Sequence, residues 1–112
     1  MQLRDLLQEL RIRDRMFPRD LAHGPAFPML LDLYAAAQDG RRVSITSLSI
    51  ASYAPATTAL RYIDLLLAAG LIERVPDWND RRRVWMKLTR TGLELVGGYL
   101  EAVGKRGLEV AA

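Results

Sequence analysis

The sequence predicts a mainly α-helical protein with one small β-hairpin, and three observations support this prediction. Apolar residues recur at helical spacing in several segments, the period changes after Gly70, and a turn-rich stretch then separates two short strand-like runs. Half of the 112 residues are hydrophobic and 26% are charged, a balance typical of folded chains rather than disordered ones. The length fits one domain over residues 1–112.

The N-terminal segment, residues 1–16, is predicted to be an amphipathic helix. Leu3, Leu6, Leu7 and Leu10 fall on one helical stripe, and charged residues fill the opposite face. Pro18 ends the helix, because proline disfavours helical backbone at the residue before it. Such a stripe either packs on its own domain or is offered to a second subunit.

Three further helices are expected before Gly70. The first runs over 26–38 and is stopped by Asp39-Gly40, where glycine can adopt a positive φ. After a possible short strand near Val43, Ser44 is predicted to cap a short helix that ends near Ser52. The next helix spans 55–69, with Pro55 in its first turn.

Residues 71–88 read as a β-hairpin with a polar tip, and Thr89 as the N-cap of a last helix over 90–111. The pair Gly97-Gly98 costs that helix about 1 kcal/mol per glycine relative to alanine, so it is weak or lies close against something. Two helices joined by a tight turn and followed by a basic hairpin make a winged helix-turn-helix, with its core at 26–92.

Positive charge is concentrated in the predicted hairpin. Between Arg74 and Arg90 there are six basic and two acidic residues, a net charge of +4, whereas the whole chain carries +3 and the remainder therefore −1. A basic strip on an otherwise balanced chain indicates a polyanionic partner. A solvated charged surface would give the same pattern.

Other functional classes lack their usual signals. Cysteine is absent, which removes disulfides and thiolate chemistry and agrees with a reducing cytoplasm. The longest apolar stretch is far shorter than the roughly 20 residues that cross a membrane, and the N-terminus shows no signal peptide. His23, the only histidine, has no metal-ligand spacing around it, and no Gly-rich phosphate loop is present. We therefore expect no catalytic residue, no cofactor, no metal and no membrane association.

A set of residues stands at fixed spacing in the stretch over residues 43–92: Arg61, Asp64, Leu66, Gly70, Leu71, Ile72, Arg74, the wing sequence Asp80-Arg81-Arg82, and Leu88-Thr89 with Gly92. In these residues the stretch resembles the MarR-type winged-helix regulators of bacteria. The resemblance implies that the 55–69 helix enters the major groove and that the hairpin lies over the backbone and minor groove. It also implies a cytoplasmic, nucleoid-associated homodimer that regulates transcription from double-stranded DNA.

Two departures from the family pattern affect these expectations. Members usually have longer terminal helices that form the dimer and enclose a ligand site, and some respond to small phenolic or lipophilic molecules. The short segments 1–16 and 90–111 still suit a homodimer but argue against a small-molecule effector. In the tight turn, Tyr53 stands where a glycine is common, so we expect the turn to be shifted to avoid a positive φ.

The candidate DNA-binding residues lie on the exposed side of the 55–69 helix and on the wing: Ala56, Thr57, Thr58, Leu60, Arg61, Arg81, Arg82 and Arg83. Leu60 either meets a thymine methyl group or packs on the preceding helix. Arg61 is a base or phosphate reader or else a surface cation. The wing arginines should alternate in direction along a strand, and we favour Arg82 and then Arg81 as the contact.

Two acidic residues are expected to support these contacts. Asp64 should orient Arg61 or a wing arginine, because an unpaired acid beside DNA weakens binding. Asp80 should fix the hairpin turn and hold Arg82. Trp85 is predicted to pack on the domain and Trp78 to be exposed. The function predicted is a sequence-specific DNA-binding regulator; the alternative is a winged-helix module that binds a protein through the 1–16 helix.

Overall fold

The computed structural model describes the backbone of residues 2–111 and the side chains of residues 2–104. The elements follow in chain order as α1 (Leu3–Met16), α2 (Ala26–Asp39), β1 (Val43–Ser44), α3 (Ile45–Ala51), α4 (Ala56–Ala68), β2 (Ile72–Pro76), β3 (Val84–Leu88) and α5 (Arg90–Ala111). The predicted mainly α-helical, winged helix-turn-helix fold is confirmed. Pro55 differs in one detail, because it is the N-cap of α4 rather than part of its first turn.

The sheet has one strand more than the predicted hairpin. β2 and β3 pair antiparallel with Ile72 opposite Leu88, and β1 joins the other edge of β3 with Val43 opposite Met86. The connection that leads from α2 to α3 is thereby tied to the returning strand of the hairpin. This strand fixes the wing against the helical part of the fold.

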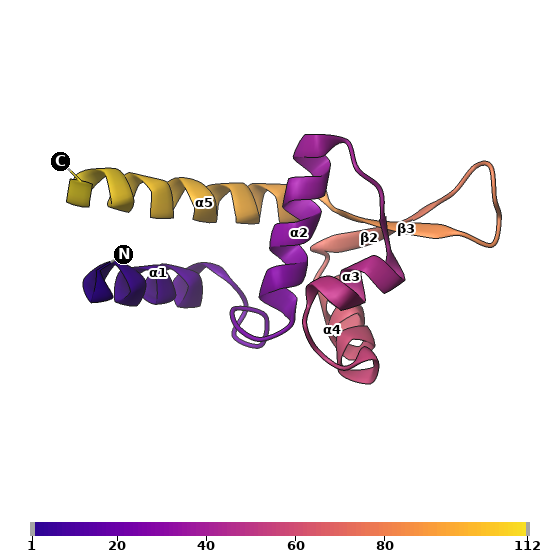
Figure 1. The fold of residues 1–112 in the computed structure, drawn as a ribbon, viewed down its shortest axis with the longest axis horizontal. Coiled ribbons are helices and arrows are strands. Elements are labelled where there is room, and N and C mark those ends of the chain that lie inside the picture. The colour runs from indigo at the N-terminus through magenta and orange to yellow at the C-terminus, as the bar shows by residue number, and fades with distance from the viewer. Residues whose placement is uncertain (1, 112) are drawn as a thin grey trace.

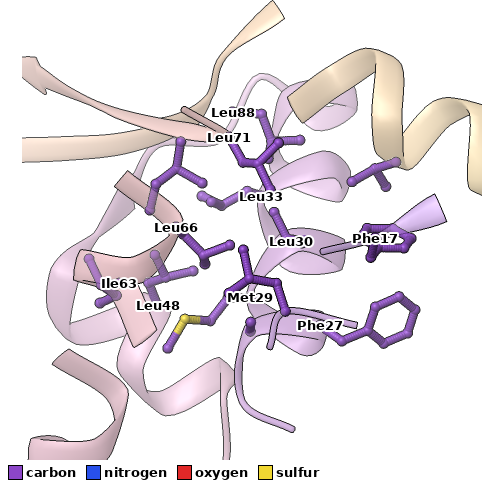
Figure 2. Packing of buried hydrophobic residues seen from close by; sticks show 14 of the residues in the cluster. Phe17, Phe27, Met29, Leu30, Leu33, Leu48, Ile63, Leu66, Leu71 and Leu88 are labelled. Carbon is purple, nitrogen blue, oxygen red and sulfur yellow. The ribbon is translucent and has the colours of Figure 1, made fainter. Parts of the chain in front are cut away.

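The core lies around α2, which stands between α1 and α5 on one side and α3, α4 and the sheet on the other (Figure 1). Its Met29, Leu30 and Leu33 are almost completely buried, and they meet Leu48 of α3 and Leu66 of α4 (Figure 2). The buried positions Ala26, Met29, Leu33 and Ala36 recur every three or four residues along α2, as burial of one helix face requires. The core therefore holds the two helices of the helix-turn-helix against one scaffold.

α1 and α5 lie side by side and extend away from the sheet; we refer to this pair as the arm (Figure 1). At its base, the rings of Phe17, Phe27 and Tyr99 meet edge to face, with centroids 5.3–5.7 Å apart. The Tyr99 hydroxyl donates to Glu9, which also accepts from Arg13 at 2.6 Å. This part-buried polar cluster joins α1 to α5 and was not predicted from the sequence.

The glycines of α5 allow close packing. A Cβ at Gly97 would lie 3.4 Å from the Tyr34 hydroxyl, and one at Gly98 would lie 3.4 Å from Met16 Cε. The second of the two interpretations of this pair, a close approach to neighbouring elements, is therefore confirmed. In the part of the chain that the structure describes, no helix is long and apolar enough to cross a membrane.

Candidate nucleic-acid interface

The helix α4 has one buried face and one exposed face. Ala59, Ile63 and Leu66 are buried in the core at a spacing of three to four residues. On the opposite side, Leu60 remains 48% exposed, so it does not pack away against the preceding helix. An exposed leucine on a helix face that otherwise carries polar groups either contacts a binding partner or is a single surface leucine that the fold tolerates.

The other candidate residues of α4 are placed as follows. Ala56, Thr57 and Arg61 are exposed, whereas Thr58 is half-buried and turns partly toward the protein. The N-terminus of α4 has no side-chain cap, because Pro55 occupies the N-cap position. Its first backbone N–H groups therefore remain available to an acceptor, beside the Thr57 hydroxyl.

The expected ion pair of Asp64 does not form. Among the ion pairs of residues 2–104, none includes Asp64, and the Arg61 guanidinium instead lies 5.9 Å from the ring centroid of Tyr62. Arg61 and Asp64 are both solvent-exposed on the same face of α4. Water solvates each charge at little cost, so nothing drives the two side chains together in the free protein.

The helix-turn-helix turn keeps a positive φ, contrary to our expectation that it is shifted. Tyr53 has φ +58°. The turn is held by hydrogen bonds from Tyr53 N–H to the Ile50 carbonyl at 3.1 Å and from the Ser52 hydroxyl to the Ser49 carbonyl at 2.6 Å. The Ala54 N–H donates back to Ser52 Oγ at 3.1 Å. These bonds impose the left-handed backbone on Tyr53, whatever its side chain.

The tip of the wing is ordered by two aspartates. Asp77 accepts from the Asn79 N–H at 2.8 Å, and this bond is the main cause that lowers the pKa of the Asp77 carboxyl. Asp80 accepts from the Arg82 N–H at 3.0 Å and from Arg82 Nε at 3.4 Å. The prediction that Asp80 fixes the turn and holds Arg82 is therefore confirmed.

The arginines of the wing do not alternate along a strand as expected. β3 begins at Val84, so Arg81, Arg82 and Arg83 precede it, and Arg83 N–H closes the turn on the Asp80 carbonyl at 3.0 Å. All three side chains are exposed, and that of Arg82 is 92% accessible. Because these three residues lie in the turn and not on the strand, their side chains do not alternate between two faces of the sheet, and all three cations lie at the tip of the wing.

The two tryptophans differ as predicted. Trp85 is half-buried on β3, and the Arg83 and Arg42 guanidiniums lie 5.3 and 5.8 Å from its ring centroid. Trp78 at the tip is 93% exposed.

Arg42 is a residue that the sequence analysis missed: it also lowers the pKa of Asp77, and it adds a further cation at the base of the wing. The sequence shows Arg41 and Arg42 as a basic pair, but no local pattern in it places Arg42 beside β3.

The position of the wing relative to α4 depends on Thr89. Its hydroxyl donates to the Gly70 carbonyl at 2.7 Å and accepts from the Gly92 N–H at 3.0 Å, as the predicted N-cap of α5. Its own N–H donates to the Leu71 carbonyl at 3.0 Å. Four of the residues that carried the family resemblance thus meet at one junction, which joins the end of α4, the base of the wing and the start of α5: Gly70, Leu71, Thr89 and Gly92.

The arm presents an apolar stripe to solvent. On α1 the residues Leu3, Leu6 and Leu7 are 71%, 44% and 42% exposed, and on α5 Leu93 and Leu100 are 39% and 41% exposed. Of the predicted stripe only Leu10 is half-buried, and the buried residue of α1 is its neighbour Ile12. The 1–16 helix therefore packs on its own domain through α5, as one of the two interpretations expected, and it leaves part of its apolar stripe uncovered.

A surface hollow of about 380 Å³ lies between the end of α2, the sheet and the start of α5. Leu33, Met86 and Leu93 contribute apolar walls, and Arg42 and Lys87 supply positive charge. Small-molecule sites start near this size. Among the described residues no group of His, Asp or Glu is placed to hold a metal ion, and His23 contacts Asp14 at 2.5 Å.

Comparison with known proteins finds the same fold in solved structures. A MepR variant of Staphylococcus aureus bound to an oligodeoxyribonucleotide matches 96% of this chain and 74% of its own, with 21% identity and a TM-score of 0.75. NadR in complex with 4-hydroxyphenylacetate matches 96% of this chain and 70% of its own, with 21% identity and a TM-score of 0.72. The transcriptional regulator Tm0710 of Thermotoga maritima matches 96% and 74%, with 22% identity and a TM-score of 0.65.

These neighbours are MarR-family transcription regulators, and the chain has their winged-helix fold. At this level of identity the likeness establishes the shared fold. No protein-family model matches the sequence, and no curated protein matches it either.

Proposed function

We propose that the protein is a sequence-specific DNA-binding regulator of transcription that acts as a homodimer in the cytoplasm, at the nucleoid. The observation that carries the proposal is the combination of an uncapped, exposed α4 N-terminus with a wing tip that bears three exposed arginines. Amides and hydroxyls at a helix N-terminus suit phosphate and base edges, and flexible cations suit the backbone and minor groove.

In this arrangement α4 enters the major groove and the wing lies over the adjacent backbone and minor groove. Ala56, Thr57, Leu60 and Arg61 face the bases or phosphates, with Thr58 at the margin. Arg82 is the first choice for the minor-groove or phosphate contact, and Arg81 and Arg83 add charge around it. Asp64 stands beside Arg61 on the exposed face, where a bound phosphate or base could bring the two together.

The exposed leucines of the arm support the homodimer. Two copies that pair through α1 and α5 would bury these leucines and present two α4 helices to one side of a duplex. A two-fold symmetric protein reads a pseudo-palindromic site with half-sites about one helical turn apart.

Binding to duplexes selected from a random-sequence pool, measured across salt concentrations, tests the proposal. Affinity should fall steeply with salt, with a log–log slope of about 0.9 per phosphate contact. The double variant Arg61→Ala/Arg82→Ala should bind more weakly and with a shallower slope. A matched control, Arg15→Ala/Arg19→Ala, removes the same charge from exposed positions outside the interface and should bind like the wild type. No binding at low salt would refute the proposal.

The second candidate function is a protein-interaction module, favoured by the same exposed stripe on α1. Deletion of residues 1–16 separates the two. If the cellular phenotype survives Arg61→Ala/Arg82→Ala but is lost on this deletion, the protein-interaction function is supported and DNA reading is not.

A further inference from the structure

Tyr53 occupies a position where the fold gains nothing from its side chain. Its φ of +58° is a conformation in which a non-glycine residue costs about 1–3 kcal/mol. The ring does not recover this cost by packing, because Tyr53 is 93% exposed. Glycine would adopt the same turn without strain. A strained, solvent-exposed aromatic residue indicates a role outside the folded chain.

The surroundings of Tyr53 indicate which partner it meets. From Val43 to Leu60 the chain has no charged residue, although charged residues make up 26% of the sequence. This stretch exposes hydroxyl groups on Thr46, Ser47 and Thr57 on both sides of the turn. A surface with hydroxyl donors and no carboxylate suits an approaching phosphate backbone.

The turn also adjoins the proposed DNA-binding end of α4. Tyr53 stands two residues before the N-cap Pro55, and Ile50, whose carbonyl accepts from the Tyr53 N–H, is itself 71% exposed. In a docked helix-turn-helix the first helix crosses the backbone while the second enters the major groove. The turn that joins them then lies at the edge of the groove.

We propose that Tyr53 is a DNA-contacting residue that packs its ring on the sugar-phosphate backbone beside the N-terminus of α4. Its hydroxyl donates to a phosphate, and Ile50 extends the apolar contact along the deoxyribose carbons. The residue positions α4 in the groove and carries no sequence preference of its own. This inference rests on the proposed function. It adds to the proposed DNA contacts a residue at a position where the family pattern commonly has glycine.

The test compares stability and DNA binding in three variants of the full chain. Tyr53→Gly relieves the strain and removes the ring, and should raise the Tm by several degrees. Tyr53→Asn also removes the ring but keeps a side chain that tolerates positive φ, so the turn stays stiffer than with glycine. Tyr53→Phe keeps the ring and removes only the hydroxyl.

We expect Tyr53→Gly and Tyr53→Asn to lower DNA affinity about tenfold, and Tyr53→Phe about threefold, each by the same factor on selected and unrelated duplexes. Weaker binding by a more stable protein excludes misfolding as the cause. Loss in the glycine variant but not in the asparagine variant would assign the effect to turn flexibility and overturn the inference.

Two further outcomes separate this inference from the proposed function. If the wild type binds DNA with a steep salt dependence while all three variants bind equally well, the proposed function stands and the role of Tyr53 is refuted. If the wild type fails to bind duplex DNA at low salt, the proposed function fails, and the contact of Tyr53 with DNA fails with it.

Discussion

The winged-helix core and the arm bury very different shares of their apolar side chains. In the core, Leu48 and Leu66 are fully buried, and α2, α3 and α4 leave little apolar surface on their facing sides. In the arm, Leu3 is largely exposed and Leu6 and Leu7 are half-exposed, and a polar cluster around Glu9 contributes to the contact between α1 and α5. The core is thus completed within one chain, whereas the arm leaves apolar side chains uncovered. Substitutions in the core should therefore lower the free energy of unfolding, whereas substitutions in the arm should weaken the proposed dimer.

The largest effect is expected where the core meets α5. A Cβ at Gly92 would lie 2.1 Å from the Leu71 carbonyl oxygen, so Gly92→Ala forces the backbone of the wing junction apart. We expect the free energy of unfolding to fall by about 3 kcal/mol or more. Gly104→Ala in the same helix meets nothing within 4 Å and should raise it by about 0.5–1 kcal/mol. Urea unfolding measures both, and a Gly92→Ala protein as stable as the wild type would contradict this account.

The second effect belongs to the arm. The variant Leu6→Ser/Leu7→Ser removes two half-exposed leucines from the stripe, so it should weaken the proposed homodimer about 100-fold or more. A fully buried leucine contributes about 1.5–3 kcal/mol, each of these has somewhat under half of its surface left to bury, and a two-fold dimer loses four of them. The stability of the monomer should change little, because these side chains contribute little to its core. Sedimentation velocity over a concentration series measures the dimer. Leu60→Ser is the control: it removes a leucine of similar exposure from α4 and should leave dimerisation unchanged.

The same division explains what the sequence could predict. Helix spacing, the Gly40 and Gly70 stops and the Ser44 cap are local signals, and they placed the elements of the core to within one or two residues. The strand pairing of β1 with β3 joins residues more than forty positions apart, and no local pattern encodes it. The Glu9–Tyr99 bond is equally remote in sequence, so it too escaped prediction.

The candidate site was predictable in part for the same reason. Asp80 acts on residues beside it in the chain, and its role followed from turn chemistry. Asp64 and Arg61 are three residues apart, yet spacing alone could not decide whether two solvated charges pair. The expected shift of the turn at Tyr53 was wrong because the hydrogen bonds around Ser52 outweigh the steric cost of a positive φ.

A smaller effect tests the polar cluster of the arm. Burial and the Glu9 carboxylate raise the pKa of Tyr99 from 10 to about 12. Because the pKa is higher in the folded state, this contribution to stability is complete below pH 10 and is lost as the pH rises toward 12. Tyr99→Phe should lower the free energy of unfolding by about 1 kcal/mol at neutral pH and remove this dependence. Unfolding measured from neutral pH to pH 12 gives the difference between the two proteins, which should narrow above pH 10; a constant difference would contradict the assignment.

The smallest effect concerns the end of the wing, the part of the winged helix farthest from the arm. Trp78 is 93% exposed beside three arginines, so its ring should cover a sugar or phosphate group when the wing lies on DNA. In a Trp85→Phe background Trp78 is the only tryptophan, and its fluorescence should change when a selected duplex is added. Trp78→Ala should weaken binding only about threefold, because the arginines remain and supply most of the attraction. The Trp85→Phe protein must bind DNA like the wild type for the signal to be read. Unchanged fluorescence on a bound duplex would place Trp78 in solvent and leave the wing contact to its arginines.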